Sequence, residues 1–362
     1  HVSFVCKEDI KEARNRSMNQ MDDLKLLRLE EEKKHIDQNF IEELAHTLID
    51  ELVLWANKEI FTPRGGELTF KMTLGPPNAI VVTDLEFPLR PRMEFTTSFI
   101  SEIYADAFSF PIISRRLDKE TETFRQFEKT KQFRDCAVRF SSALPELFES
   151  NVADLFRPVC EMFVRLNQER QNNNQQLQPN EVRCRFIMFE LMLVWTFFHE
   201  LGHIVQGHYR MHLSAPSLTG DYSFYELDEI TPVLAECKGL SMKSVAAGKV
   251  APDLAAQARE LMADAEATDQ TLKYLVMKRR LTFNVWYLQL CSTSCMFQRF
   301  YNKYPDKLEL SPARHPHPLI RDEASQLLGI NWLADYLVAT GSIKKREDAN
   351  IPIAYLGTRA SL

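Results

Sequence analysis

The chain has 362 residues, of which 45% are hydrophobic and 26% are charged, and this composition is typical of a globular protein. Its formal net charge of −6 argues against a dedicated nucleic-acid-binding protein, because neutralising phosphates requires clustered Lys and Arg. The 7 cysteines form no C-x-x-C pair, which argues against a disulfide framework or a cysteine zinc knot and fits free thiols in a reducing cytoplasm.

The N-terminal part of the chain carries helical patterns. Residues 1–35 are dense in charged side chains with a sparse apolar stripe, which indicates a solvated helical arm or, alternatively, a helix that binds a protein partner. Residues 37–60 show a stronger pattern, because apolar side chains recur at three- and four-residue steps: Phe40, Ile41, Leu44, Leu48, Leu52 and Trp55. We therefore expect a helical arm over residues 1–60, followed by one domain over 61–362. The charged N-terminus predicts no signal peptide.

One region has the alternating pattern of a β-sheet. It predicts strands over 68–74, 79–83 and 92–97, with a turn at 75–78 and a helix from 98 to about 108. No other region alternates convincingly. We therefore expect a mainly helical α+β fold whose small sheet lies within residues 68–97.

The rest of the chain is expected to be helical. Helices are predicted over 123–149, 152–171, 181–206, 228–247, 252–279 and 282–301, and a last short one ends near Leu328. Gly207 is expected to end the third of these helices. Residues 208–227 are expected to form a loop that contains Tyr222 and Tyr225.

The most apolar segment, residues 186–205, has the length of a membrane span. It carries four polar side chains whose burial in lipid would be costly: Glu190, His199, Glu200 and His203. We therefore expect a buried core helix and no membrane span.

The end of this segment reads His199-Glu-Leu-Gly-His203, an H-E-x-x-H motif. Residues four apart lie on one face of an α-helix, so both imidazoles could reach one metal ion. Glu200 follows the first ligand and is a candidate general base. The motif occurs by chance in roughly one chain of this length per hundred, so the rest of the site decides its meaning.

A catalytic zinc site has three protein ligands and an open position. His208 is the nearest candidate for the third ligand. If the helix continued, His208 would lie about 180° around the axis from His199 and about 140° from His203, so we do not expect it to bind the same ion.

The better candidates for the third ligand are acidic and lie downstream. Glu260 and Asp264 share one face of a predicted helix, so one can bind the metal while the other accepts the free N–H of a ligating histidine. Glu236 also lies on a predicted helix but has no such companion. We expect Glu260 to be the ligand, with Glu236 as the alternative.

The motif H-E-L-G-H, followed after an insertion by R-E-x-x-A-D, resembles the gluzincin metallopeptidases, in particular the HtpX and CAAX-prenyl-protease group. A His-Pro segment at 314–321 is similar to one near the C-terminus of that family. The resemblance covers roughly residues 180–325. Many of those relatives are embedded in membranes, and the soluble Lit-type phage-exclusion peptidases resemble this chain equally closely.

The resemblance implies a zincin-like catalytic domain over residues 61–362 and a role for each matched residue. It implies that zinc is bound by His199, His203 and Glu260, that Glu200 is the base and that Asp264 orients a histidine. The expected function is a soluble, cytoplasmic zinc endopeptidase that acts on a protein or peptide substrate. For the donor to the tetrahedral oxyanion, our first choice is His315, followed by Arg321, Tyr222 and Tyr225.

Two other interpretations compete with the peptidase. One is a non-catalytic zinc-binding protein, regulatory or toxin-like, whose helical arm binds a partner; the intact Glu200 argues against it, because a structural zinc site needs no base. The other is that the motif is accidental and that His199 and His203 are core histidines, which would then need several buried partners.

Overall fold

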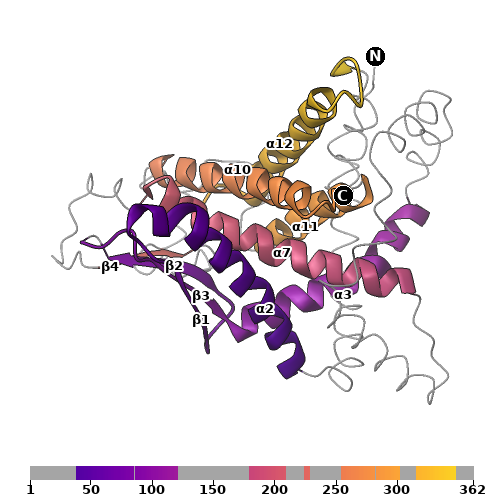
Figure 1. Ribbon diagram of the computed structural model, residues 1–362. Coiled ribbons are helices and arrows are strands. Elements are labelled where there is room, and N and C mark those ends of the chain that lie inside the picture. Colours follow the sequence, from indigo (N-terminus) through magenta and orange to yellow (C-terminus); the bar gives the residue numbers. More distant parts are fainter. Residues whose placement is uncertain are drawn as a thin grey trace, which may run out of the picture.

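The computed structural model describes residues 38–84, 86–120, 179–208, 224–228, 254–281, 283–301 and 315–347 (Figure 1). This part of the chain is mainly helical and contains one small sheet, so the expected α+β class is confirmed. The expected helices over 123–149 and 152–171, nearly all of that over 228–247, and residues 1–37 of the expected arm lie outside the described residues.

The sheet has four strands, β1 (Thr69–Thr73), β2 (Ala79–Asp84), β3 (Arg92–Thr96) and β4 (Phe224–Asp228), in the order β1-β3-β2-β4. The first three lie where the alternating pattern predicts them. β3 pairs in parallel with β1 and antiparallel with β2. The fully buried side chains of Ala79, Val81, Met93 and Phe95 join the hydrophobic core.

The fourth strand corrects the sequence prediction, which assigned residues 208–227 to a loop. β4 pairs antiparallel with β2, with Leu227 opposite Val81 and Tyr225 opposite Thr83. Its backbone hydrogen bonds therefore come from a strand far upstream. A short edge strand held by such a distant partner has little local sequence signal.

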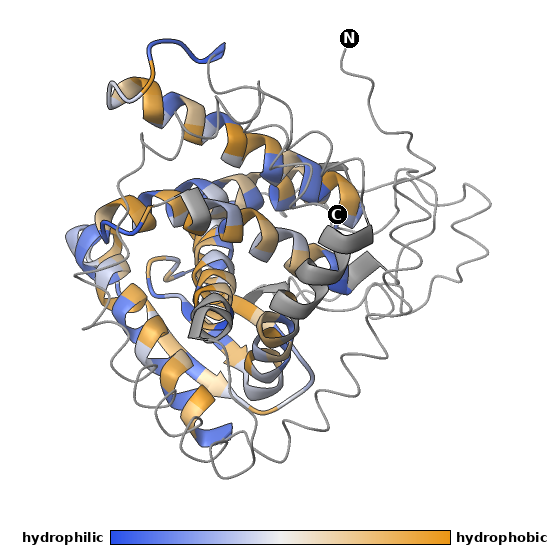
Figure 2. Cartoon of the chain, turned by 90° about the vertical axis from the view of Figure 1, so that its right-hand side faces the viewer, coloured by the Kyte–Doolittle hydropathy of each residue, from blue (hydrophilic) through white to orange (hydrophobic). Residues whose placement is uncertain are grey.

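Helix α7 (Pro179–Val205) runs through the middle of the molecule and is its central core element (Figure 1). Every side chain from 185 to 204 is buried, which explains the apolar run. In the turned view of Figure 2 this helix is seen nearly end on, and its ribbon is mostly hydrophobic. The expectation of a buried core helix is confirmed, and within the described residues no helix is long and apolar enough to cross a membrane.

Helix α2 (Gln38–Ala56) packs on α7 and begins where the sequence predicts. Its buried side chains belong to the same hydrophobic core as those of α7: Ile41, Leu44, Ala45, Ile49, Leu52 and Ala56. A π-helical turn (Asn57–Phe61) and a 3-10 turn (Thr62–Arg64) follow, and Gly65 ends them with a left-handed φ of 74°. This segment of the expected arm is thus packed against the core.

The remaining helices complete the core around α7. Helix α3 (Thr97–Glu120) follows β3 and runs beyond the predicted end near residue 108. Helices α10 (Leu254–Met277) and α11 (Phe283–Tyr301) match the prediction. Both pack on α7, as does α3.

Helix α12 (Pro318–Ala339) corrects the prediction of a short helix that ends near Leu328. The glycine that follows, Gly329, lies inside the helix. A Cβ atom there would come within 2.9 Å of Cδ2 of Leu290 on α11, so the glycine allows close packing and does not end the helix. Beyond it, the buried Leu333, Ala334 and Leu337 continue the apolar face.

Candidate metal centre

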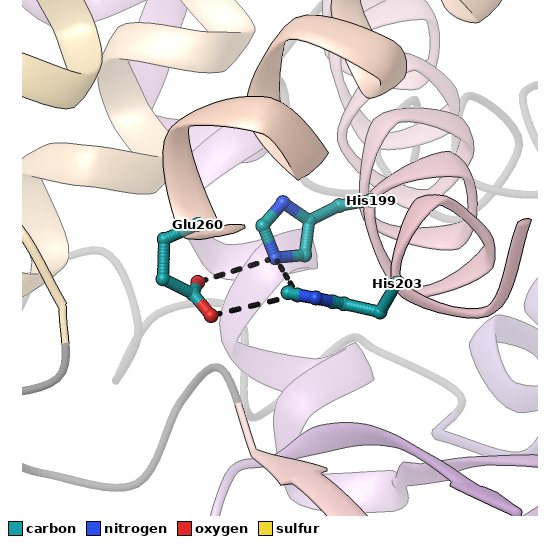
Figure 3. Close-up of side chains that lie close together, drawn as sticks. All are labelled: His199, His203 and Glu260. Atoms are coloured by element: carbon teal, nitrogen blue, oxygen red, sulfur yellow. Dashed lines mark hydrogen bonds and ion pairs between the residues drawn. The ribbon is translucent and has the colours of Figure 1, made fainter. Parts of the chain in front are cut away.

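Two helices bring the predicted ligands together. His199 and His203 are one turn apart near the C-terminal end of α7, and Glu260 faces them from α10 (Figure 3). Gly202 lies on the side of α7 that contacts α10, where a Cβ atom would lie 3.5 Å from the Cα of Ala263. The nearest atom would be the Cβ of Glu266 at 3.3 Å, so a side chain at this position would crowd α10 only slightly.

The ligating atoms converge on one point. The Nε2 atoms of His199 and His203 are 3.1 Å apart. The Glu260 carboxylate places one oxygen 3.5 Å from the Nε2 of His199 and the other 3.5 Å from the Nε2 of His203. Within the part of the chain that the structure describes, these three side chains form the group that could hold a metal ion.

These separations leave room for a metal ion between the three side chains. Zinc binds imidazole nitrogen and carboxylate oxygen at about 2.0–2.2 Å, which places neighbouring ligand atoms about 3.3–3.6 Å apart. The distance of 3.1 Å between the two nitrogens, and of 3.5 Å from each nitrogen to its nearer carboxylate oxygen, are close to that range, although each nitrogen faces a different oxygen of Glu260. The two nitrogens and one carboxylate also match a common ligand set of catalytic zinc.

The protonation of the group also suits a metal. All three side chains are buried. Burial holds the pKa of His203 well below its usual value, and the nearby His199 and His208 lower it further against the opposing charge of Glu260. Burial acts to raise the pKa of Glu260, but the basic side chains that face it, His315 first, outweigh this effect and hold its pKa well below the usual value. A neutral imidazole and a carboxylate are the forms that bind metal ions.

Asp264 and Trp195 contact the imidazole of His199. The Nδ1 of His199 lies 2.9 Å from Oδ1 of Asp264, one turn beyond Glu260 on α10. When Nδ1–H donates to this carboxylate, the lone pair of Nε2 faces the other ligands. The indole of Trp195 stacks on the imidazole, with ring centroids 5.3 Å apart. The contact places Asp264 beside the first histidine, and its role in orienting that ring stays a prediction.

Arg321 lies behind Asp264. On the first turn of α12, it donates from Nε and Nη2 to the two Asp264 oxygens at 2.7 and 2.6 Å. Its Nη2 is also 3.5 Å from Oε2 of Glu260, and its guanidinium lies 4.9 Å from the centre of the Phe297 ring. The sequence marked Arg321 as a supporting residue but not as the partner of Asp264.

His315 reaches the site from the segment before α12. Its Nε2 is 3.5 Å from Oε2 of Glu260, and the side chain is buried. His317, two residues later, has a different role. Its Nδ1 accepts a hydrogen bond from the backbone N–H of Leu319 and caps α12, with Pro318 as the first helical residue.

Of the other predicted site residues, two lie within the described part of the chain and two lie outside it. Glu200 is fully buried on α7, next to the first ligand. Tyr225 lies on the edge strand β4. Tyr222 and the alternative ligand Glu236 lie outside the described residues.

His208 is outside the ligand group, as expected, but it contacts that group in a way that the sequence did not predict. Its Nδ1 lies 2.7 Å from the Nδ1 of His203. Burial lowers the pKa of the His208 imidazole to about 4. Gly207, with a left-handed φ of 70°, turns the chain at the end of α7, so the angular estimate for a continuing helix does not apply.

Comparison with known proteins gives no relative: no protein-family model, no curated protein and no solved structure matches the chain. The geometry of the site therefore carries the functional argument.

Proposed function

We propose that the chain is a zinc-dependent endopeptidase of the gluzincin type, with His199, His203 and Glu260 as ligands in a zincin-like domain. The observation that carries this proposal is the convergence of two Nε2 atoms, 3.1 Å apart, with a buried carboxylate. Two imidazole lone pairs and a carboxylate repel one another, so a cation between them stabilises the arrangement.

The ligand types favour zinc among the common metals. Imidazole nitrogens suit zinc, copper, iron and nickel, whereas magnesium and calcium prefer oxygen alone. The separations leave room for a small ion between the three side chains, and Asp264, 2.9 Å from the Nδ1 of His199, is the kind of outer carboxylate that such sites commonly have.

The reaction that we propose is hydrolysis of a peptide bond by water. When bound, zinc would polarise the scissile carbonyl and make a water molecule more acidic. Glu200 takes a proton from the attacking water and delivers it to the leaving amine. His315, which approaches the site on the Glu260 side, donates a hydrogen bond to the oxyanion. Tyr222 and Tyr225 are the reserve candidates for that donor.

The substrate that we propose is an extended protein segment. β4 is an edge of the described sheet, and an extended peptide can pair with such an edge as an additional strand. In Figure 3 this strand passes below the ligand group. The buried free thiol of Cys291 is compatible with the cytoplasmic location that the cysteine pattern suggests.

The first prediction tests the base. Glu200→Gln should keep zinc and lose hydrolysis by about 10²–10⁴-fold, because the amide cannot accept the proton of the water. We would measure zinc content and compare cleavage products across a proteome for the wild-type and variant chains. Glu43→Gln, the same change on the exposed side of α2, is the matched control and should cleave like the wild type.

Three results would contradict the proposal. If the wild-type chain binds no zinc, the proposed metal site is wrong. If the zinc-loaded Glu200→Gln chain cleaves at an unchanged rate, Glu200 is not the general base. Zinc binding without cleavage by the wild type would instead favour the non-catalytic zinc-binding interpretation.

A further inference from the structure

His208 contacts the Nδ1 atom of His203, the second candidate ligand, as Asp264 contacts the Nδ1 atom of His199, the first. Its imidazole is fully buried, and its ring centroid is 4.9 Å from that of His203, with the planes inclined by 67°. The two Nδ1 atoms are 2.7 Å apart, within the range of a hydrogen bond.

The short turn after α7 builds this contact. The N–H of Gln206 bonds to the carbonyl of Gly202 at 2.9 Å, and the N–H of Gly207 bonds to that of Ile204 at 3.0 Å. Gly207 then takes its left-handed φ of 70°, a conformation that costs glycine little. The chain bends back, and His208 returns to the side of the helix that carries His203.

A contact of 2.7 Å between two ring nitrogens requires a proton between them, and there are two ways to place it. If His208 donates, the proton of His203 must sit on Nε2, where it points at His199 and Glu260 and blocks metal binding. If His203 donates, its Nε2 presents a lone pair to the site. Only the second arrangement allows His203 to be a ligand.

We propose that His208 is a positioning residue for the metal centre: its Nδ1 accepts the Nδ1–H of His203 and fixes the tautomer and orientation in which His203 binds the ion. Outer partners of this kind orient the ligating ring and raise its affinity for the metal. In the described part of the chain the Nε2 of His208 has no hydrogen-bond partner, so His203 provides the hydrogen bond that orients this imidazole there.

His208 differs from Asp264 in charge. Asp264 is an acceptor whose negative charge is matched by Arg321 at 2.6 Å, whereas a neutral imidazole adds no charge. Both candidate histidine ligands thus lie beside an acceptor, and Glu260 is the candidate ligand that contributes a negative charge. A divalent ion in this site keeps a net positive charge, which favours its action as a Lewis acid. The inference rests on the proposed metal site but not on the hydrolysis of peptides.

The test compares two substitutions of equal shape in the full-length chain. His208→Asn places an amide oxygen near the position of Nδ1 and keeps the acceptor. His208→Leu has nearly the same shape as the asparagine variant but removes the acceptor. Zinc affinity, measured by competition with a chelator, should fall about 10–100-fold in His208→Leu and stay within about threefold of the wild type in His208→Asn. Thermal unfolding of the metal-free proteins checks that all three chains fold.

Three outcomes would overturn the inference. It fails if His208→Leu binds zinc within about threefold of the wild type, or if His208→Asn loses as much affinity as His208→Leu. A wild-type chain that binds no zinc overturns both this inference and the proposed function, whereas tight binding by all three chains overturns the inference alone.

A measurement on the wild type does not depend on how the variants fold. Nitrogen-15 NMR of the zinc-loaded chain, with the His203 signals assigned, should show the proton of His203 on Nδ1 and the metal on Nε2. The reverse assignment would overturn the role of His208.

Discussion

At the scale of single residues, the pair of Asp264 and Arg321 links the metal centre to the rest of the protein. Asp264 lies 2.9 Å from the Nδ1 of His199 on one side and accepts hydrogen bonds from Arg321 on the other, and the side chains of Asp264 and Arg321 are almost completely buried. A buried ion pair is sensitive to the loss of one partner, because the remaining charge then stays in a medium of low polarity.

The second prediction follows from this pair. Arg321→Met should lower the free energy of unfolding by about 3–5 kcal/mol, because it leaves the Asp264 carboxylate buried without its cation. Urea denaturation in the presence of a chelator measures this loss separately from metal binding. The exposed Arg346, which pairs with Asp335 at 3.3 Å, gives the matched control, and Arg346→Met should cost less than about 1 kcal/mol.

The double variant Asp264→Asn, Arg321→Met extends this test. It removes both charges, so it should recover part of the stability that Arg321→Met loses. If the double variant is less stable than Arg321→Met by the full effect of Asp264→Asn, the two side chains do not interact and the interpretation of the pair is wrong.

At the scale of elements, the ligands depend on how α7 packs against α10. A second network of largely buried side chains connects these two helices nearer the start of α7. There Glu190 accepts from Tyr274 at 3.1 Å and from Nη2 of Arg280 at 2.8 Å. This network sets the relative position of the helices without touching the metal ligands.

The third prediction concerns the pH dependence of this network. Burial, and then the charge of Glu190, raise the pKa of Tyr274 above its usual value of 10.0. A phenol whose pKa is higher in the folded than in the unfolded chain contributes stability that is fully present below pH 10 and is lost as the pH rises above it. The free energy of unfolding of the wild type should therefore fall above about pH 10.

The control for this prediction is Tyr274→Phe. It should cost about 1 kcal/mol at neutral pH through the lost hydrogen bond, and its stability should decline less steeply above about pH 10. Urea denaturation of both chains over that range measures the difference. Parallel curves for the two chains would show that Tyr274 is not the group responsible.

At the scale of the whole molecule, the ligands come from two helices that are distant in sequence, and His315 and Arg321 come from a third segment at α12. An ion that binds only the folded chain stabilises it by mass action, by about 2.7 kcal/mol when its free concentration is a hundred times the Kd. The core around α7 is built from many buried apolar side chains whose packing needs no metal, so the fold should survive removal of the metal.

The fourth prediction states this as an experiment. Treatment with a chelator should lower the melting temperature and leave the helical circular dichroism signal at room temperature unchanged. Return of zinc should restore the melting temperature, and magnesium should not, because the ligand group contains two imidazoles. A chelator that leaves the unfolding transition unaffected would argue against a metal ion in the native protein.

The sequence by itself determined the features that depend on local spacing. Histidines four apart on a helix share a face, and so do Glu260 and Asp264, so each pair follows from periodicity once its helix is recognised. That Glu260 rather than Glu236 is the third candidate ligand did not follow from periodicity. The strands at 69–73, 79–84 and 92–96 and the burial of α7 follow from alternation and from apolar content in the same way.

The tertiary structure alone decided the features that depend on contacts between distant segments. β4 exists as a strand because β2 supplies its hydrogen bonds, and α12 continues through Gly329 because α11 packs against that glycine. Arg321 meets Asp264, and His208 returns to His203, because helix packing and one left-handed residue bring them there. Neither a helix–helix approach nor a single backbone reversal leaves a periodic signal, so such contacts become visible only when the chain is folded.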